Sequence, residues 1–213
     1  MKLNKKHIPL LFCVFYTVGI GGYLWPVSRP WFIAVTPFSI AGSLILVLFL
    51  HPKWDRGSVV CLLVTAAMGF FIEYAGVHTG LLFGRYHYGA TLGPGWQGIP
   101  WLIGLNWAAM VYYSQAVMHK WAKYPIAPLI GALLMTLYDF LLEPSAIAYD
   151  FWQWDNGTIP MQNYIAWFIC SGMFHFLYQR YGKPVKNPVA AKLFWIQAAF
   201  FGLLWAGNLL LPA

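Results

Sequence analysis

The chain has 213 residues, of which 60% are hydrophobic, 19% are aromatic and only 9% are charged. Because soluble domains carry about a quarter charged residues, this composition excludes a soluble globular domain and a disordered chain. The formal net charge of +7 comes from basic residues scattered between apolar runs, a pattern typical of membrane topology signals rather than of nucleic-acid binding. The sequence therefore predicts an all-α, polytopic membrane protein with one integral domain over residues 1–213 and no nucleic-acid partner.

Seven apolar stretches approach the length of about 20 residues that a helix needs to cross a bilayer. Prolines, a glycine-rich stretch and a polar stretch separate them. The first stretch follows three lysines but has no small-residue cleavage site before Pro26, so we expect an uncleaved span rather than a signal peptide. The predicted spans are 8–25, 31–50, 58–77, 99–118, 125–144, 161–180 and 191–211.

The basic residues are distributed unequally between the two sides of this bundle. With a cytoplasmic N-terminus, only Arg29 and Arg85 lie on the outer side. Since cytoplasmic loops carry an excess of lysine and arginine, we expect a cytoplasmic N-terminus, an outer C-terminus and insertion in a bacterial inner membrane. The cytoplasmic set is Lys2, Lys5, Lys6, Lys53, Arg56, Lys120, Lys123, Arg180, Lys183, Lys186 and Lys192.

Asp139 and Glu143 stand four residues apart near the outer end of the fifth predicted span, with Glu143 beside Pro144 at the expected helix end. This spacing places both carboxyl groups on one helix face. Repulsion and burial predict that one of them keeps a proton near neutral pH and acts as a general acid beside an ionised partner. The alternative is that both acids simply line the loop boundary and contact water or headgroups.

Glu73 lies about one turn from the outer end of the third predicted span. A charged carboxylate near a helix C-terminus is disfavoured by the helix dipole, so we expect compensation by His78, by Arg85 or by a retained proton. A structural ion pair with Arg85 is the alternative role. Residues 78–98, rich in glycine, tyrosine and tryptophan, are expected to fold back as a re-entrant lid, which requires cover by protein or contact with water.

Spans three and four resemble spans five and six in plan. Each pair rises to a carboxylate near the outer side and then enters an Ile-Pro that opens the descending helix. Two such hairpins, related by an axis along the membrane normal, would bring both acid sites together; a chance match of short motifs is the alternative. The matching residues are Pro100, Asn106 and Trp107 in the first pair, and Pro160, Asn163 and Trp167 in the second.

Aromatic residues are concentrated near these acids. Interfacial belts explain many of the 12 tryptophans, but ring faces also stabilise cations and pack against flat conjugated chains. The six histidines stand singly, without the clusters that a di-iron site needs, and no phosphate-binding motif is present; we expect neither a metal nor a cofactor. The tryptophans in or near the outer half are Trp96, Trp101, Trp107, Trp152, Trp154 and Trp167.

Four motifs follow one another along the chain. They read ExxGxxTGxxFGxYxYG from Glu73 to Gly89, then GIPWLIGLNW, then DxxxEPxAIxxDFWxW from Asp139 to Trp154 followed by IPxQNYxAW. Together they resemble the carotenoid biosynthesis membrane protein family, whose characterised members are hydratases of the bisanhydrobacterioruberin hydratase and carotenoid 1'-hydratase type. The resemblance covers roughly residues 60–180, and the EPxAIxxDFW form is most similar to that of pigmented Bacteroidetes.

The resemblance implies hydration of a terminal double bond on an acyclic C40 or C50 carotenoid, with water and membrane lipid as the other partners and other carotenoid enzymes as associates. Such chemistry needs a positioned acid and passes through a tertiary carbocation. We expect Asp139 to be the leading proton donor with Glu143 as its partner, and Glu73, with His78 or Tyr86, to position water or return the proton. The expected substrate-binding residues are Trp101, Asn106, Trp107, Trp152, Trp154, Asn163 and Trp167.

Two other functions remain open from the sequence. Cyclisation of a carotenoid end group begins with the same protonation, but an internal alkene instead of water captures the cation. A seven-helix transporter or lipid-binding protein would use the outer carboxylates as a proton site and would alter no pigment. The mass of the product separates hydration from cyclisation.

Overall fold

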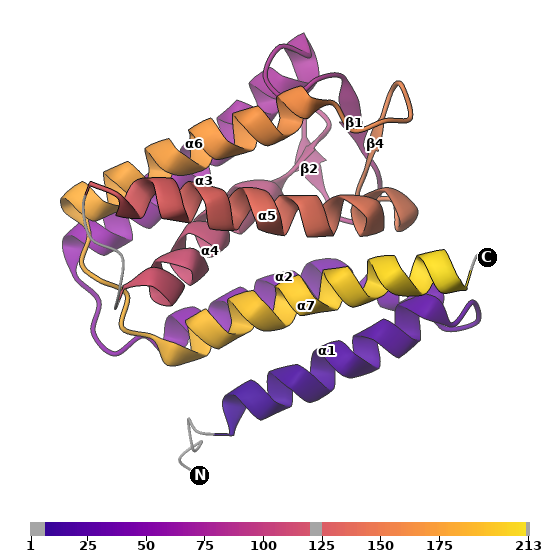
Figure 1. Cartoon of the computed structure of the whole chain (residues 1–213), viewed down its shortest axis with the longest axis horizontal. Helices are drawn as coiled ribbons and strands as arrows, with labels where there is room; N and C mark the ends of the chain where they lie inside the picture. The colour runs from indigo at the N-terminus through magenta and orange to yellow at the C-terminus, as the bar shows by residue number, and fades with distance from the viewer. Residues whose placement is uncertain (1–6, 120–124, 212–213) are drawn as a thin grey trace.

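The computed structural model describes residues 7–119 and 125–211 (Figure 1). Five basic residues behind the predicted orientation, Lys2, Lys5, Lys6, Lys120 and Lys123, lie outside the described residues. The helices are α1 (Ile8–Leu24), α2 (Arg29–Phe49), α3 (Arg56–Thr79), α4 (Trp101–Met118), α5 (Ala127–Ala148), α6 (Met161–Tyr181) and α7 (Pro188–Leu210). The short strands are β1 (Tyr86–Tyr88), β2 (Gly95–Trp96), β3 (Ile99–Pro100) and β4 (Trp152–Trp154).

Every predicted span overlaps one of these helices, with ends that differ by up to four residues, and a helical architecture is confirmed for the described residues, where the strands are two or three residues long. Four helices, α2, α3, α5 and α7, are long and apolar enough to cross a membrane by length and composition. Such helices indicate an integral membrane protein. The count of seven spans and the orientation of the termini stay predictions. The start of α1 and the end of α7 lie at opposite ends of the bundle (Figure 1).

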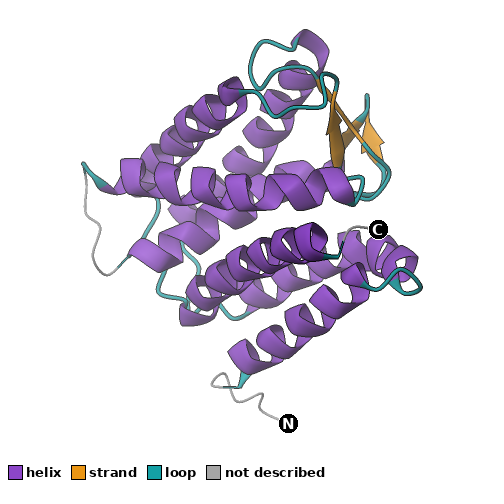
Figure 2. Cartoon of the chain, turned by 45° about the vertical axis from the view of Figure 1, so that its right-hand side comes forward, coloured by secondary structure: helices purple, strands orange, loops and turns teal. Residues whose placement is uncertain are grey.

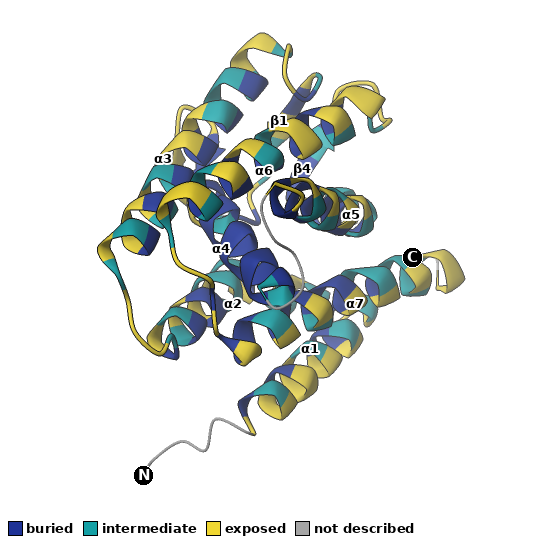
Figure 3. Cartoon of the chain, turned by 60° about the vertical axis from the view of Figure 1, so that its left-hand side comes forward, coloured by how far each residue is buried: buried dark blue, intermediate teal, exposed yellow. Residues whose placement is uncertain are grey.

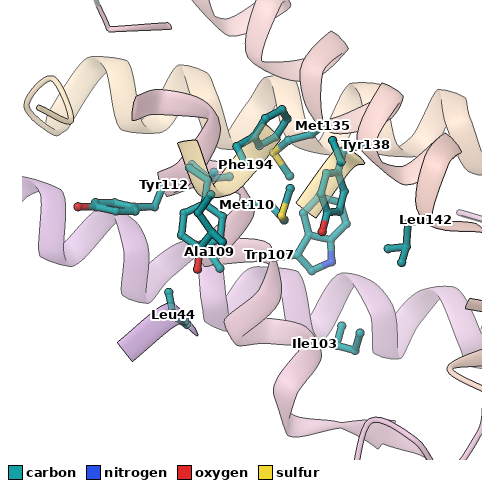
Figure 4. Close-up of a cluster of buried hydrophobic side chains, with 14 of the residues drawn as sticks. Leu44, Ile103, Trp107, Ala109, Met110, Tyr112, Met135, Tyr138, Leu142 and Phe194 are labelled. Atoms are coloured by element: carbon teal, nitrogen blue, oxygen red, sulfur yellow. The ribbon is translucent and has the colours of Figure 1, made fainter. Parts of the chain in front are cut away.

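Helix α4 is the centre of the bundle. It buries 14 of its 18 residues and is the dark helix between its neighbours in Figure 3. Helix α3 packs against it on one side and α7 on another, while α5 packs against α6 and α1 against α7. Because protein rather than lipid surrounds α4, its sequence tolerates polar and aromatic residues that lower its hydropathy. Part of the core around α4 is shown in Figure 4, where Met110 lies near Met135 and Tyr138.

Helix α5 corrects the expected end of the fifth span. Pro144 lies inside the helix, which continues to Ala148, so Glu143 is not at a helix end. A proline within a helix removes one hydrogen bond to the carbonyl four residues earlier. The helix continues because Ser145 and Ala146 are buried in the bundle and the Tyr149 N–H donates to the Ser145 carbonyl at 3.0 Å.

Strands β1 and β4 join the two loops at one end of the bundle, as Figure 2 shows. They pair antiparallel, with Tyr86 opposite Trp154 and Tyr88 opposite Trp152. Because successive side chains of a strand point to opposite faces, these four aromatic residues share one face. On the other face the His87 imidazole lies 3.4 Å from the Asp155 carboxylate. The expected re-entrant lid is thus a strand pair between the two loops.

A second short pairing brings β2 against β3 and leads directly into α4. Its turn residues, Gln97 and Gly98, have φ angles of 52° and 80°, as the tight turns favoured in hairpins require. A Cβ at Gly95 would come within 2.0 Å of the Ile99 carbonyl oxygen, so only glycine fits there. The Ile-Pro of the sequence therefore serves as a strand that fixes where α4 begins.

Candidate active site

Three carboxyl groups are buried at the strand-bearing end of the bundle. The exposed fractions of Glu73, Asp139 and Glu143 are 5%, 0% and 1%. Among the described residues, no lysine or arginine side chain forms an ion pair with any of them. Burying a charge without a partner is costly, so the groups around these acids decide which of them can hold a charge.

Glu73 is surrounded by donors from β1 and α4. The Tyr86 and Tyr88 hydroxyls both donate to its Oε2, the latter at 2.7 Å, and the Trp107 indole N–H donates to its Oε1 at 2.9 Å. Burial, followed by the neighbouring Glu73 carboxyl, raises the pKa of Tyr86 and of Tyr88 well above the ordinary value, so both hydroxyls keep the protons that they donate.

The alternative role for Glu73, a structural ion pair with Arg85, is not found among the described residues. The alternation of β1 turns Tyr86 and Tyr88 toward Glu73, whereas Arg85 is exposed and its backbone carbonyl accepts from the Asp155 N–H at 3.1 Å. Hydroxyl and indole groups therefore hold the Glu73 carboxyl where the sequence left His78, Arg85 or a retained proton as candidates.

Glu143 is held by donors from β4 and α6. The indole N–H groups of Trp152 and Trp154 both donate to its Oε2 at 3.0 Å. The Asn163 side-chain amide donates to Glu143 Oε1 at 3.2 Å and to Asp139 Oδ2 at 2.8 Å. One amide thus joins the two acids of α5. Asp139 Oδ1 is buried and has no hydrogen-bond partner among the described residues.

These groups surround a small cavity of about 30 Å³. Roughly 10–15 Å³ suffices for one water molecule when polar partners are present, so the cavity has room for water beside the acids. Glu73 and Glu143 both line it. Asp139 does not line it, but accepts a hydrogen bond from Asn163, which does. Among the described residues, no three histidine, cysteine, aspartate or glutamate side chains come together as a metal site would require.

Aromatic rings form most of the remaining wall. Trp107 and Trp167 stack with their ring centroids 4.2 Å apart, and both line the cavity. Tyr86 lies against Trp154 at 5.1 Å. A positive charge that developed in this cavity would therefore meet ring faces as well as carboxylates.

The structure brings most of the expected site residues together. As the repeated hairpin plan predicted, both acid sites open into one cavity, with Glu73, Asn106 and Trp107 from one hairpin and Glu143, Asn163 and Trp167 from the other. Tyr86, Trp152 and Trp154 also line it. Sequence reasoning missed Tyr88, although the Tyr-His-Tyr alternation around His87 was the available signal.

Two expected residues lie elsewhere. The His78 side chain is exposed, stacks on Tyr74 at 4.2 Å and has its Nδ1 2.9 Å from the Tyr74 carbonyl oxygen. Trp101 is 56% exposed and stacks on Phe70 at 5.0 Å. Both side chains lie on outward faces of their helices, because each is out of phase with the residue of its helix that reaches the cavity, Glu73 in α3 and Trp107 in α4.

The fold and site define a helical membrane bundle with a small, carboxylate-lined cavity. The chain belongs to the carotenoid biosynthesis protein family, whose sequence model matches residues 35–211. It is 26% identical over 193 residues to the bisanhydrobacterioruberin hydratase of Haloarcula japonica. The match covers 84% of this chain and 64% of that relative, so the chain spans less than two thirds of the relative's length. No solved structure matches the chain.

Proposed function

We propose that this protein adds water to the terminal double bond of an acyclic carotenoid end group and forms a tertiary alcohol. Its family has a role in carotenoid biosynthesis, and the relative from Haloarcula japonica is named as a hydratase. The observation that carries the proposal is the enclosed pair of acids on α5, joined by Asn163 beside a cavity with room for water.

The proposed reaction proceeds in two steps that balance. A carboxylic acid gives its proton to the less substituted alkene carbon, and the electron pair of the double bond forms the new C–H bond. A tertiary carbocation remains. The oxygen of water then bonds to that carbon, and a carboxylate takes the proton that the oxygen releases. Because no net oxidation or reduction occurs, the proposal includes no redox cofactor and no metal.

In this proposal Asp139 is the leading proton donor and Glu143 is its partner. Both oxygens of Glu143 accept hydrogen bonds from N–H groups, an arrangement that suits a carboxylate. Asp139 Oδ1 has no such donor among the described residues, so it is the oxygen that can carry a proton. Glu143 lines the cavity and conveys the proton of the pair to the alkene.

Glu73 completes the proposed reaction on the opposite wall. Its hydrogen bonds from Tyr86, Tyr88 and Trp107 suit an ionised carboxylate that orients water and accepts its proton. This proton then returns through water in the cavity to the acid pair, which restores the starting state for the next turnover. His78 has no part in the proposal because its side chain lies away from the cavity. The parts of the Trp107 and Trp167 rings that line the cavity stabilise the carbocation that exists between the two steps.

The experiment is mass spectrometry of carotenoids from a lycopene-producing bacterium that expresses this chain. We expect a pigment heavier by one water, which disappears with Asp139→Asn and with Glu73→Gln. Trp101→Phe, outside the cavity, is the control and should leave the product unchanged. An isomer of unchanged mass would instead establish cyclisation. Membership in a biosynthesis family does not favour the transporter.

We also propose that the seven helices all cross a bacterial inner membrane, with a cytoplasmic N-terminus and the carboxylate cavity toward the outer side. The unequal distribution of lysine and arginine supports this orientation. Reporter fusions at the two termini test it, and a cytoplasmic C-terminus would contradict it. Membrane lipid and other enzymes of carotenoid synthesis are the proposed surroundings.

A further inference from the structure

A second, apolar cavity of about 140 Å³ adjoins the carboxylate cavity. The two share the side chains of Ile103, Asn106, Leu142 and Trp152 in their walls. Figure 4 shows Ile103 and Leu142 projecting from α4 and α5 near Trp107. The apolar cavity therefore ends where the acids begin, and an apolar chain lying in it would place its end group beside Glu143.

The other side of this apolar cavity reaches a groove between α1 and α2. The cavity and the groove share Phe15, Val35 and Ser39 in their walls. The groove lies open at the surface, where Phe38 is 76% exposed. A Cβ at Gly42, in the groove wall, would meet no atom within 4 Å. The surface groove thus adjoins the apolar cavity, and the apolar cavity adjoins the carboxylate cavity, each through side chains that line both spaces.

The polar groups along this route bond to one another. The Tyr23 hydroxyl pairs with the Thr36 hydroxyl, and the Gln197 side-chain amide donates to the Tyr16 hydroxyl at 2.6 Å. Three of these four side chains are paired in full, and only Gln197 Oε1 has no partner among the described residues. Apolar side chains form most of the wall, so the cavity presents mainly apolar surface to a ligand, as a hydrocarbon chain requires.

Helix α2 forms the less tightly packed side of the groove. It buries only Thr36, Ser43, Leu44 and Val47, so few contacts hold it against the rest of the bundle. Pro37 lies inside this helix and removes the hydrogen bond to the Ile33 carbonyl, which weakens the helix beside the cavity. The family model matches residues 35–211, so its match begins within α2 and does not include α1, which forms the other side of the groove.

From these shared walls we infer that the groove between α1 and α2 is a lateral entrance through which an elongated isoprenoid polyene passes from the lipid to the carboxylates. The end group lies at Asn106 and Trp152, the adjoining chain occupies the apolar cavity, and the remainder extends through the groove. This inference rests on the proposed function for the identity of the ligand, but it concerns binding and not the reaction.

The test measures lycopene binding to the full chain in lipid nanodiscs by quenching of tryptophan fluorescence, in a Glu143→Gln background that prevents turnover. Gly42→Phe fills the groove, and Gly21→Phe is the matched control, because a Cβ at Gly21 also meets no atom within 4 Å but lies outside both cavities and the groove. We expect binding about tenfold weaker or more for Gly42→Phe, as for an overfilled site, and unchanged for Gly21→Phe.

A second pair keeps the test independent of any folding defect at position 42. Ser39→Trp narrows the wall that the cavity and groove share, and Ile45→Trp places the same side chain on the lipid-exposed face of α2. Only Ser39→Trp should weaken binding. Equal lycopene binding by both members of both pairs, or no lycopene binding by the parent chain, would overturn the lateral entrance.

The failure of the entrance is distinguishable from the failure of hydration. If cells make no pigment heavier by one water but Gly42→Phe binds lycopene more weakly than Gly21→Phe, then the entrance stands and hydration falls. If the parent chain hydrates lycopene and Gly42→Phe equals Gly21→Phe in both binding and turnover, then hydration stands and the entrance falls.

Discussion

The two ends of the bundle bury polar groups in opposite ways. At the end far from the strands, the Tyr112 hydroxyl lies 2.7 Å from His51 Nδ1 and accepts from the Asn187 amide at 3.0 Å. Asn187 also donates to the Val47 carbonyl and caps α7. Each of these groups finds a partner in a neighbouring element, so the cluster fastens α2, α4 and α7 together. Its polarity serves the fold.

At the strand-bearing end, the buried groups converge on a space instead of on each other. The side chains that donate hydrogen bonds to Glu73 and Glu143 also line the cavity, which has room for water beside both acids. Buried carboxyl groups without a basic partner destabilise a fold. The strand-bearing end therefore lowers the free energy of unfolding, whereas the paired groups of the opposite end raise it. The comparison teaches that polar burial marks a functional site where the groups face a cavity rather than one another.

The largest expected effect comes from the acid pair. Asp139→Asn and Glu143→Gln keep the size of each side chain but remove the proton that the pair can transfer. We expect turnover to fall by about 10²–10⁴-fold, the usual contribution of a general acid, with no loss of thermal stability. Pigment conversion and thermal unfolding of the same preparations measure the two. Full turnover in both variants would contradict the difference between the two ends, because the acids would then have a structural role only.

Trp167 tests the aromatic wall. Trp167→Leu removes a ring face from the cavity, and we expect turnover to fall by about 2–30-fold, which corresponds to a cation–π contribution of about 0.5–2 kcal/mol. Trp101→Leu removes an exposed indole and serves as the control. Equal turnover in the two variants would exclude a stabilising role for the stacked ring.

Asn187 tests the opposite end. Asn187→Ala removes the cap of α7 and leaves Tyr112 and the Val47 carbonyl without their amide partner, so we expect a loss of about 1–3 kcal/mol in the free energy of unfolding. Turnover per folded molecule should not change. If Asn187→Ala kept the free energy of unfolding of the parent chain but lost turnover, the result would contradict a purely structural role for this end of the bundle.

The smallest effect concerns pH. Burial lowers the pKa of His51 from its ordinary value of 6.5, so the unfolded chain binds this proton more readily than the folded chain. The contribution of His51 to stability is therefore present above about pH 6.5 and diminishes as the pH falls below it. As the pH falls below about 6.5, the melting temperature of the parent chain should decrease more than that of His51→Gln. Identical pH profiles would show that His51 does not sense pH.

The helices and most of the candidate site residues could be predicted from the sequence. Particular residues show why the rest could not. Hydropathy alone predicted helices α1 to α7, and acids within apolar runs predicted the roles of Glu73 and Glu143 as cavity residues. The pairing of β1 with β4 escaped because each strand has three residues and its partner lies more than sixty positions away. That pairing decides which side chains turn inward, so Tyr88 was missed and Arg85 was kept as a candidate partner of Glu73.

The central claim is tested most directly by incubating the purified protein with lycopene in water labelled with oxygen-18. The account predicts a product that is heavier by one labelled water and carries the heavy oxygen in a tertiary hydroxyl group. An isomeric product without oxygen, or an oxygenated product without the label, would contradict hydration.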